Sequence, residues 1–374
     1  MPSTALRQQV ITKARRIVVK MGTHLLFDGK GEVDTKFLAS IARQVAELFS
    51  QGKDVTLVSS GAIGIGCRAL GLAKRPTDVA ASQAAAAVGQ SGLMTYWHDA
   101  FAAVGLNVAQ LLVTRNDFED RARYLNIRNC IAELHSYKAV PIVNENDTVA
   151  VDEIRLGEND VLSAMLANAL PADLLVLLSV VGGVEDAEGR ILDFIHDPAD
   201  AMGLVRSSKT KMGSGGMQTK LEAARIVTDA GEVAVIANGK EPNVLLRLLA
   251  GEKVGTAFLP ANRRMESKKR WIGMTVRPAG VIVVDDGAAK ALAEKGKSLL
   301  ASGITEITGN FDKGDVLVVR DQRGRELARG LSNYRADEAR LIMGKRSSQF
   351  EKLLGRKAYD EVIHRDNMAL AAPR

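Results

Sequence analysis

The sequence predicts a two-domain α/β protein, with an open, mostly parallel sheet packed between helices and a smaller β-rich domain after it. Short β-branched runs alternate with longer helical patterns from residue 16 to about 260. The runs are almost continuously apolar, which is typical of strands buried on both faces of a parallel sheet. Beyond residue 280, short strand-like runs are joined by glycine-marked turns, which predicts the second domain.

Six strands are expected in the first domain. They are RIVVK at 16–20, DVTLV at 54–58, NVAQLLV at 107–113, AVPIV at 139–143, LLVLLSVV at 174–181 and EVAVIA at 232–237. Between the first two, apolar residues recur at helical spacing over 37–48, behind a cap at Asp34 and before Gly52. This spacing predicts a crossover helix between parallel strands.

The domain boundaries are expected at 14–262 for the α/β domain and 280–360 for the β-rich domain. The charged run that starts at Arg263 leads to Trp271 and Pro278, which predicts a linker over 263–279. The chain has 374 residues, enough for two domains with their own cores.

Composition narrows the class of protein. Hydrophobic residues make up 46% and aromatic residues only 4%, so the core is expected to be aliphatic. The formal net charge of +6 favours anions such as nucleotides without requiring nucleic acid. Cys67 and Cys130 form no CxxC motif and no Cys/His cluster, so no disulfide framework or zinc site is expected. No secretory signal and no bilayer-spanning apolar stretch is seen, which predicts a cytoplasmic protein with no membrane partner.

The first motif is VVKMGTHLL at 18–26, where a strand ends in Lys20 and turns through Gly22 and Thr23. Backbone N–H groups in such a turn, together with a lysine, favour a polyphosphate. A solvated lysine at a strand end is the alternative.

The second motif is VSSGAIGIGCRALG at 58–71, a strand followed by small residues and a helical pattern. The GxGxxG order is not met, which argues against a dinucleotide site. Ser60 and its neighbouring amides, including that of Gly61, can hold a carboxylate at a strand's carboxyl end.

The third motif spans 143–167 and holds two polar clusters, Asn144–Asp147 and Asn159-Asp160. A turn and an N-cap at Asp160 are the structural alternative. Two clusters at ends of predicted elements favour a lined pocket, because Asn and Asp side chains bind an ammonium group and a carboxylate can hold lysines near phosphate.

The fourth motif is KMGSGGMQTKLEAARIV at 211–227, in which glycines precede Lys220 and a helix. It is not a Walker A loop, but an amide-rich loop at a helix N-terminus with a lysine also suits phosphate. A surface loop is the alternative. The histidines suggest no catalytic triad, which fits phosphoryl transfer, where positioning and charge neutralisation do most of the work.

Taken in order, VVKMGT, SSGAI, NENDTVA, GENDVLSA and GSGGMQTK closely resemble the glutamate 5-kinases of the amino-acid kinase superfamily. The C-terminal part resembles the PUA domain that many of them carry. The resemblance implies the amino-acid kinase fold followed by a small PUA barrel. It implies phosphorylation of the γ-carboxylate of L-glutamate with ATP and Mg²⁺, the first step of proline biosynthesis.

The resemblance also implies partners. These are proline as a feedback inhibitor, further copies of the chain in a dimer or tetramer, and functional coupling to glutamate-5-semialdehyde dehydrogenase.

Site residues follow motif by motif. By resemblance, Lys20 and Lys220 neutralise the transferring phosphoryl group and Asp160 holds both. Glutamate is expected at Ser60, Asp147 and Asn159, with Asn144 and Gly61 nearby. The nucleotide is expected at Lys20, Gly22, Thr23, Ser179, Val180, Ser214, Gly215, Gly216, Met217, Gln218, Thr219 and Lys220. Ser179-Val180 replaces the usual Thr-Asp, which leaves the ribose or base contact and the nucleotide preference open.

Two alternatives stay open at this point. One is another kinase of the superfamily, acting on acetylglutamate, aspartate, carbamate or a nucleoside monophosphate, although the NEND and GENDVLSA pair favours glutamate. The other is a mainly RNA-binding PUA protein. From residue 281 onward the basic excess is small and no aromatic-rich surface is apparent, so RNA is not indicated.

Overall fold

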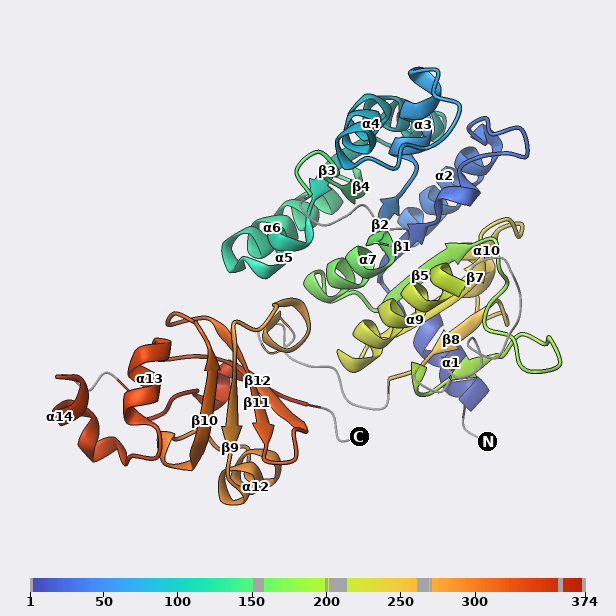
Figure 1. Cartoon of the computed structure of the whole chain (residues 1–374). Coiled ribbons are helices and arrows are strands. Elements are labelled where there is room, and N and C mark those ends of the chain that lie inside the picture. The colour runs from blue at the N-terminus through green and yellow to red at the C-terminus, as the bar shows by residue number, and fades with distance from the viewer. Residues whose placement is uncertain are drawn as a thin grey trace. The chain divides into compact units, whose positions relative to one another are not determined.

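The computed structural model describes residues 3–150, 158–198, 201, 214–260, 269, 271–355 and 359–371. The chain forms two compact units, Met1–Arg264 and Met265–Arg374, and each carries its own sheet (Figure 1). The predicted linker over 263–279 lies partly outside the described residues, so its limits stay a prediction.

The first unit holds an eight-stranded sheet in the order β3-β4-β2-β1-β5-β7-β8-β6. The strands are β1 (Arg16–Met21), β2 (Asp54–Ser59), β3 (Val108–Val113), β4 (Val140–Glu145), β5 (Leu174–Ser179), β6 (Phe194–Ile195), β7 (Val233–Asn238) and β8 (Thr256–Phe258). All neighbours pair in parallel except β7 and β8. This confirms the predicted open, mostly parallel sheet.

Helices pack against this sheet. They are α1 (Ser3–Thr12), α2 (Thr35–Ser50), α3 (Ala62–Ala69), α4 (Val79–Ala102), α5 (Arg115–Glu119), α6 (Arg121–Ser136), α7 (Glu158–Ala169), α9 (Ser214–Asp229) and α10 (Val244–Leu249), with a 3₁₀ turn at Thr23–Leu25. The predicted crossover helix is α2: the Asp34 carboxylate accepts a hydrogen bond from the Phe37 amide at 2.9 Å. None of the helices described is both long and apolar enough to cross a bilayer.

The strand register brings the motifs to one edge of the sheet. Lys20 pairs with Val58 of β2 and Leu177 of β5, and Val58 pairs with Val143 of β4. Because the strands run parallel, the polar residues that end β1, β2, β4 and β5 lie side by side.

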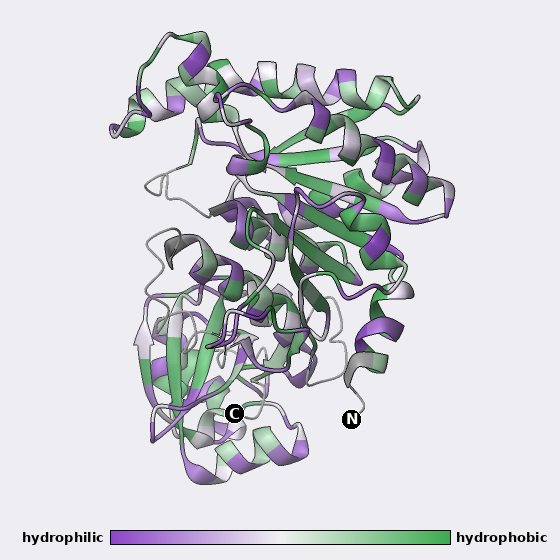
Figure 2. Cartoon of the chain, turned by 90° about the vertical axis from the view of Figure 1, so that its right-hand side faces the viewer, coloured by the Kyte–Doolittle hydropathy of each residue, from purple (hydrophilic) through white to green (hydrophobic). Residues whose placement is uncertain are grey.

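The alternation of side chains along β1 decides which way Lys20 faces. Ile17, Val19 and Met21 pack into the aliphatic core that also contains residues of α2, α4 and α10. Lys20 therefore faces the opposite side of the sheet, where it meets α7. The strands of the sheet are largely hydrophobic (Figure 2), as the apolar runs of the sequence predicted.

Two glycines set the contact between α3 and α4. A Cβ added to Gly66 would lie 1.7 Å from the carbonyl oxygen of Ala85, and one added to Gly89 would lie 1.9 Å from that of Ala62. The two backbones therefore touch, which fixes the N-terminus of α3 next to Gly61, whose φ of +104° only glycine adopts readily.

The second unit contains a five-stranded sheet in the order β10-β9-β11-β12-β13. Its strands are β9 (Gly280–Val284), β10 (Ile304–Gly309), β11 (Val316–Asp321), β12 (Glu326–Leu331) and β13 (Met368–Leu370). Its helices are α12 (Asp286–Lys295), α13 (Ala336–Ile342) and α14 (Phe350–Leu354), with short helical turns at Trp271–Thr275, Ala301–Gly303, Ser347–Gln349 and Arg365–Asn367. The predicted order of strand, helix and further short strands is confirmed, and the unit has its own buried core.

Candidate active site

A cavity of about 920 Å³ opens at the carboxyl edge of the first sheet. Residues from all four motifs line it. From the predicted set these are Lys20, Gly22, Thr23, Ser60, Gly61, Asn144, Asp147, Asn159, Asp160, Ser179, Val180, Gly216, Met217 and Lys220. The cavity therefore gathers segments that lie far apart in the sequence.

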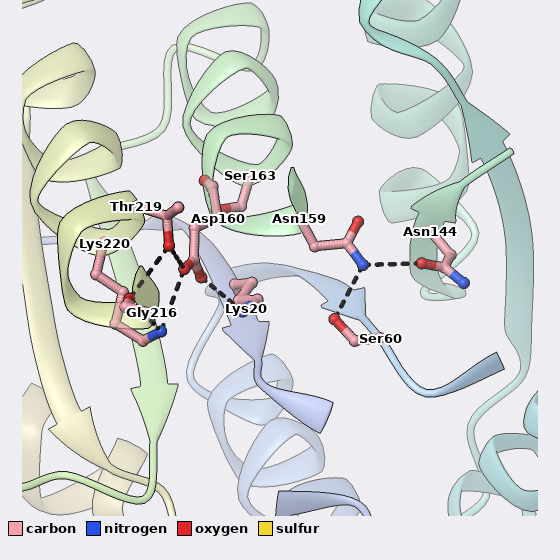
Figure 3. Close-up of polar contacts among 9 residues, drawn as sticks. All are labelled: Lys20, Ser60, Asn144, Asn159, Asp160, Ser163, Gly216, Thr219 and Lys220. Carbon is pink, nitrogen blue, oxygen red and sulfur yellow. Dashed lines mark hydrogen bonds and ion pairs between the residues drawn. The ribbon is translucent and has the colours of Figure 1, made fainter. Parts of the chain in front are cut away.

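One end of the cavity is built around the carboxylate of Asp160 (Figure 3). Nζ of Lys20 lies 2.5 Å from its Oδ1, and Nζ of Lys220 lies 3.1 Å from its Oδ2. The three side chains come from β1, α7 and α9, and all three are buried. Asp160 lies inside α7, so the alternative that it caps the helix is wrong.

Burial and charge shift the pKa values of this cluster. Burial lowers the pKa of Lys20 by penalising its charged form, Asp160 opposes that shift, and the like charge of Lys220 adds to it. Burial raises the pKa of Asp160, but the charges of Lys20 and Lys220 outweigh that effect and hold its pKa below the ordinary value. Asp160 is therefore an ionised carboxylate at neutral pH that keeps two cations together.

The second turn of α9 is hydrogen-bonded to the same carboxylate. The Thr219 hydroxyl donates to Oδ2 of Asp160 at 2.8 Å, and Nζ of Lys220 donates to the carbonyl oxygen of Gly216 at 3.0 Å. These contacts place the N-terminal end of α9 beside the lysines, where its free backbone N–H groups favour an anion.

The other end of the cavity is an amide network that contains no cation. Nδ2 of Asn159 donates to Oγ of Ser60 at 2.9 Å and to Oδ1 of Asn144 at 3.0 Å (Figure 3). Asp147 and the Gly61 backbone line the same cavity. Short polar groups of this kind recognise both the ammonium and the carboxylate of an amino acid.

Some predicted residues lie at the margin or outside what the structure describes. Gln218 is exposed and does not line the cavity, because its position on α9 turns it away from Lys220. Ser214 and Gly215 begin α9. Val180 lines the cavity and is 47% exposed. Because this residue is a valine, it offers no carboxylate to a ligand in the cavity. Residues 151–157 and 202–213, which include parts of two motifs, lie outside the described residues.

Sequence reasoning missed several lining residues. The connection between α3 and α4 contributes Leu72, Lys74 and Arg75, and the turn after β1 contributes His24. The adjacent cations at 74 and 75 were a visible signal, but nothing in the local pattern places that connection over the site.

The carboxylates that the structure describes do not form a metal cage of their own. No group of three or more His, Cys, Asp or Glu side chains gathers in the part of the chain that the structure describes. Both oxygens of Asp160 face lysines, so its negative charge is already balanced by the protein.

Family comparisons agree with the two units. The model of the amino acid kinase family matches residues 15–238, and the model of the PUA domain matches residues 280–354.

The chain is similar to known enzymes over nearly its full length. It is 44% identical to the glutamate 5-kinase of Caldanaerobacter subterraneus subsp. tengcongensis, over 95% of this chain and 97% of that protein. It is 43% identical to the glutamate 5-kinase of Syntrophotalea carbinolica, over 98% of this chain and all of that protein. Among solved structures, N-acetylglutamate synthase from Neisseria gonorrhoeae has a TM-score of 0.52 at 14% identity, over 69% of this chain and 62% of that one, a likeness of fold alone.

Proposed function

The chain belongs to the amino acid kinase family and, within it, to the glutamate 5-kinases. We propose that its cavity binds glutamate at the end formed by Ser60, Asn144 and Asn159, the amide end. We propose that it binds the ATP phosphates at the end formed by Lys20, Asp160 and Lys220, the lysine end. The enzyme transfers the terminal phosphoryl group of ATP to the γ-carboxylate of L-glutamate, the first step of proline biosynthesis. The single observation that carries the site assignment is the contact of Lys20 and Lys220 with one buried carboxylate.

The lysine end neutralises charge as the phosphoryl group moves. The transferring group carries negative charge on its equatorial oxygens, and both the attacking carboxylate and the leaving nucleotide are anions. Lys20 and Lys220 approach from opposite sides of Asp160, so their positive charges are fixed before the substrates arrive. Preorganised cations of this kind stabilise the transition state without having to reorient.

The amide end holds the acceptor substrate. The Ser60 hydroxyl and the Gly61 amide offer donors to a carboxylate, while Asp147 and Asn159 offer acceptors to the α-ammonium group. This arrangement directs the far end of glutamate, the γ-carboxylate, toward Lys20. The first two turns of α9, from Ser214 to Lys220, wrap the ATP phosphates.

Magnesium enters the proposal as part of the nucleotide. The described carboxylates do not build a protein cage for it. A magnesium ion commonly binds nucleotide phosphates and keeps several waters, so it would arrive with ATP and supply further charge neutralisation.

Family membership also supports proposals that the geometry of one chain does not address. We propose feedback inhibition by proline, assembly into a dimer or tetramer, functional coupling to glutamate-5-semialdehyde dehydrogenase, and a cytoplasmic location.

A coupled assay of ADP release tests the proposed site use. With ATP and Mg²⁺, L-glutamate should support turnover, whereas aspartate, N-acetylglutamate, carbamate and UMP should not. Turnover with one of those acceptors in place of glutamate would contradict the assignment of the amide end.

A further inference from the structure

A chain of hydrogen bonds from Gln90 through Asn144 and Asn159 to Ser60, here called the relay, connects α4 to the amide end of the cavity. Nδ2 of Asn144 donates to Oε1 of Gln90 at 2.8 Å, and Oδ1 of Asn144 accepts from Nδ2 of Asn159 at 3.0 Å. The same Nδ2 of Asn159 donates to Ser60. Gln90 does not itself line the cavity, so it acts only through Asn144.

A backbone group fixes the direction of this relay. The N–H of Glu145 donates to Oδ1 of Asn144 at 2.9 Å, and a backbone N–H can only donate. The oxygen of Asn144 must therefore face Glu145, and its NH₂ group must face Gln90, which presents an oxygen. Asn159 in turn can only offer its NH₂ group to the oxygen of Asn144.

The direction of the hydrogen bonds in the relay determines which donor and acceptor groups are available to the substrate. The NH₂ group of Asn159 uses both hydrogens, on Ser60 and on Asn144 (Figure 3). Its Oδ1 is buried and has no hydrogen-bond partner within the described part of the chain. Ser60 accepts from Asn159, so the proton of its hydroxyl stays available for donation. The relay thus presents one acceptor and one donor, which match the ammonium and the carboxylate of a free amino acid.

Helix α4 supports the same region through a second contact. Nε1 of Trp97 donates to Oγ of Ser59 at 2.9 Å, and that hydroxyl donates to the carbonyl oxygen of Ser60 at 3.2 Å. Both Trp97 and Ser59 are fully buried. The backbone of Ser60 is therefore held by α4. Gln90, on the same helix, accepts a hydrogen bond from Asn144, which in turn contacts Asn159.

We propose that Gln90 is a positioning residue for the acceptor substrate: it keeps the Asn144 and Asn159 amides oriented so that Asn159 presents its oxygen to the α-ammonium group. This inference rests on the proposed use of the amide end for glutamate. Without the Gln90 oxygen, the NH₂ group of Asn144 loses its acceptor, and the Asn144 amide is held less firmly, by the Glu145 N–H and Asn159 on its oxygen side.

The test compares Gln90→Leu, Gln90→Glu and the neighbouring control Ser91→Ala, whose exposed hydroxyl donates to the carbonyl oxygen of Val88 in α4. Loss of this one part-buried hydrogen bond predicts that Gln90→Leu raises the KM for glutamate about 5- to 15-fold. The KM for ATP, kcat and Tm should stay near the wild-type values. Gln90→Glu should restore much of the glutamate affinity because a carboxylate oxygen still accepts from Asn144.

A second ligand tests whether Oδ1 of Asn159 binds the ammonium group of the substrate. Glutarate, which lacks the ammonium group, should inhibit competitively, and its inhibition constant should change less than the glutamate KM in Gln90→Leu. An unchanged glutamate KM in Gln90→Leu, a parallel rise in the KM for ATP with a fall in Tm, or equal effects on glutarate and glutamate would overturn the inference. An inactive wild-type enzyme with glutamate would instead overturn the proposed function.

Discussion

The ammonium group of Lys20 lies 2.5 Å from Oδ1 of Asp160, although the two residues belong to different motifs, one on β1 and one on α7. Strand alternation turns Lys20 away from the aliphatic core and toward that helix. The second oxygen of Asp160 binds Lys220, so one buried carboxylate holds two cations together at one end of the cavity.

Asp160→Asn tests this cluster through stability. The variant leaves two buried ammonium groups close together without a counter-charge, and breaking a buried ion pair in this way costs about 3–5 kcal/mol. Urea denaturation at pH 7 should show a loss of that size in the free energy of unfolding, together with nearly abolished turnover.

The stability difference between wild type and Asp160→Asn should depend on pH in one direction. The folded-state pKa of Asp160 lies below the ordinary 3.8, so its contribution is fully present above that pH and is lost as pH falls through the folded-state value. The difference in unfolding free energy between wild type and Asp160→Asn should therefore shrink as pH falls below 3.8. A difference that grows toward acid would contradict the ion-pair account.

Asp147→Ala should act on the other end of the cavity. Removing one charged hydrogen-bond acceptor predicts a rise of about 10- to 100-fold in the KM for glutamate. The KM for ATP serves as the internal control in the same steady-state assay. Should the KM for ATP rise while that for glutamate stays constant, the two ends of the cavity have been assigned in the wrong order.

Gly66→Ala should disturb the site from a distance. The added Cβ would meet the backbone oxygen of Ala85, which cannot move aside as a side chain can, and overpacking of this kind costs about 1–3 kcal/mol. The displaced α3 carries Gly61 with it, so the KM for glutamate should rise more than the KM for ATP.

Gly29→Ala is the matched control for that variant, because a Cβ there has nothing within 4 Å. Thermal unfolding of both variants measures this effect: the Tm should fall for Gly66→Ala and stay unchanged for Gly29→Ala. Equal Tm values for Gly66→Ala and wild type would show that α3 and α4 are not in backbone contact.

His135 should make stability depend on pH near neutrality. Burial lowers the pKa of His135 below 6.5, and the opposing charge of Asp54 only partly offsets that shift, while Nε2 of the ring contacts the Thr56 hydroxyl at 3.0 Å. Since the unfolded chain binds the proton more readily, stability should fall as pH drops below 6.5 toward the folded-state pKa.

Urea denaturation between pH 8 and pH 5 measures that slope. The variant His135→Gln should have a flatter dependence than wild type. Identical slopes in wild type and His135→Gln would assign the pH dependence to other groups.

The sequence predicted the long elements because their patterns are strong. The apolar runs that became β1, β2, β4, β5 and β7 are six residues each and buried, and the cap at Asp34 was readable from its position. Strands β6 and β8 have only two and three residues, too few to show a period, and were not predicted.

The site was predicted where its residues stand at the ends of elements. Local patterns drew attention to Lys20, Ser60, Asn144 and Asp160, and the family resemblance gave them their expected roles. Gln90 could not be found in this way, because it lies in an alanine-rich helix with no distinctive spacing. Its contact with Asn144 arises only when α4 packs beside the ends of β2 and β4.

The turnover number of Lys220→Ala tests the central claim most directly. Lys253→Ala, an exposed lysine of the same unit, is the matched control. With fold and Tm preserved, Lys220→Ala should lower kcat for ATP and glutamate by about 100-fold or more, as expected when a preorganised group that stabilises developing charge is removed. A kcat equal to that of wild type would contradict the assignment of the two lysines to the transferring phosphoryl group.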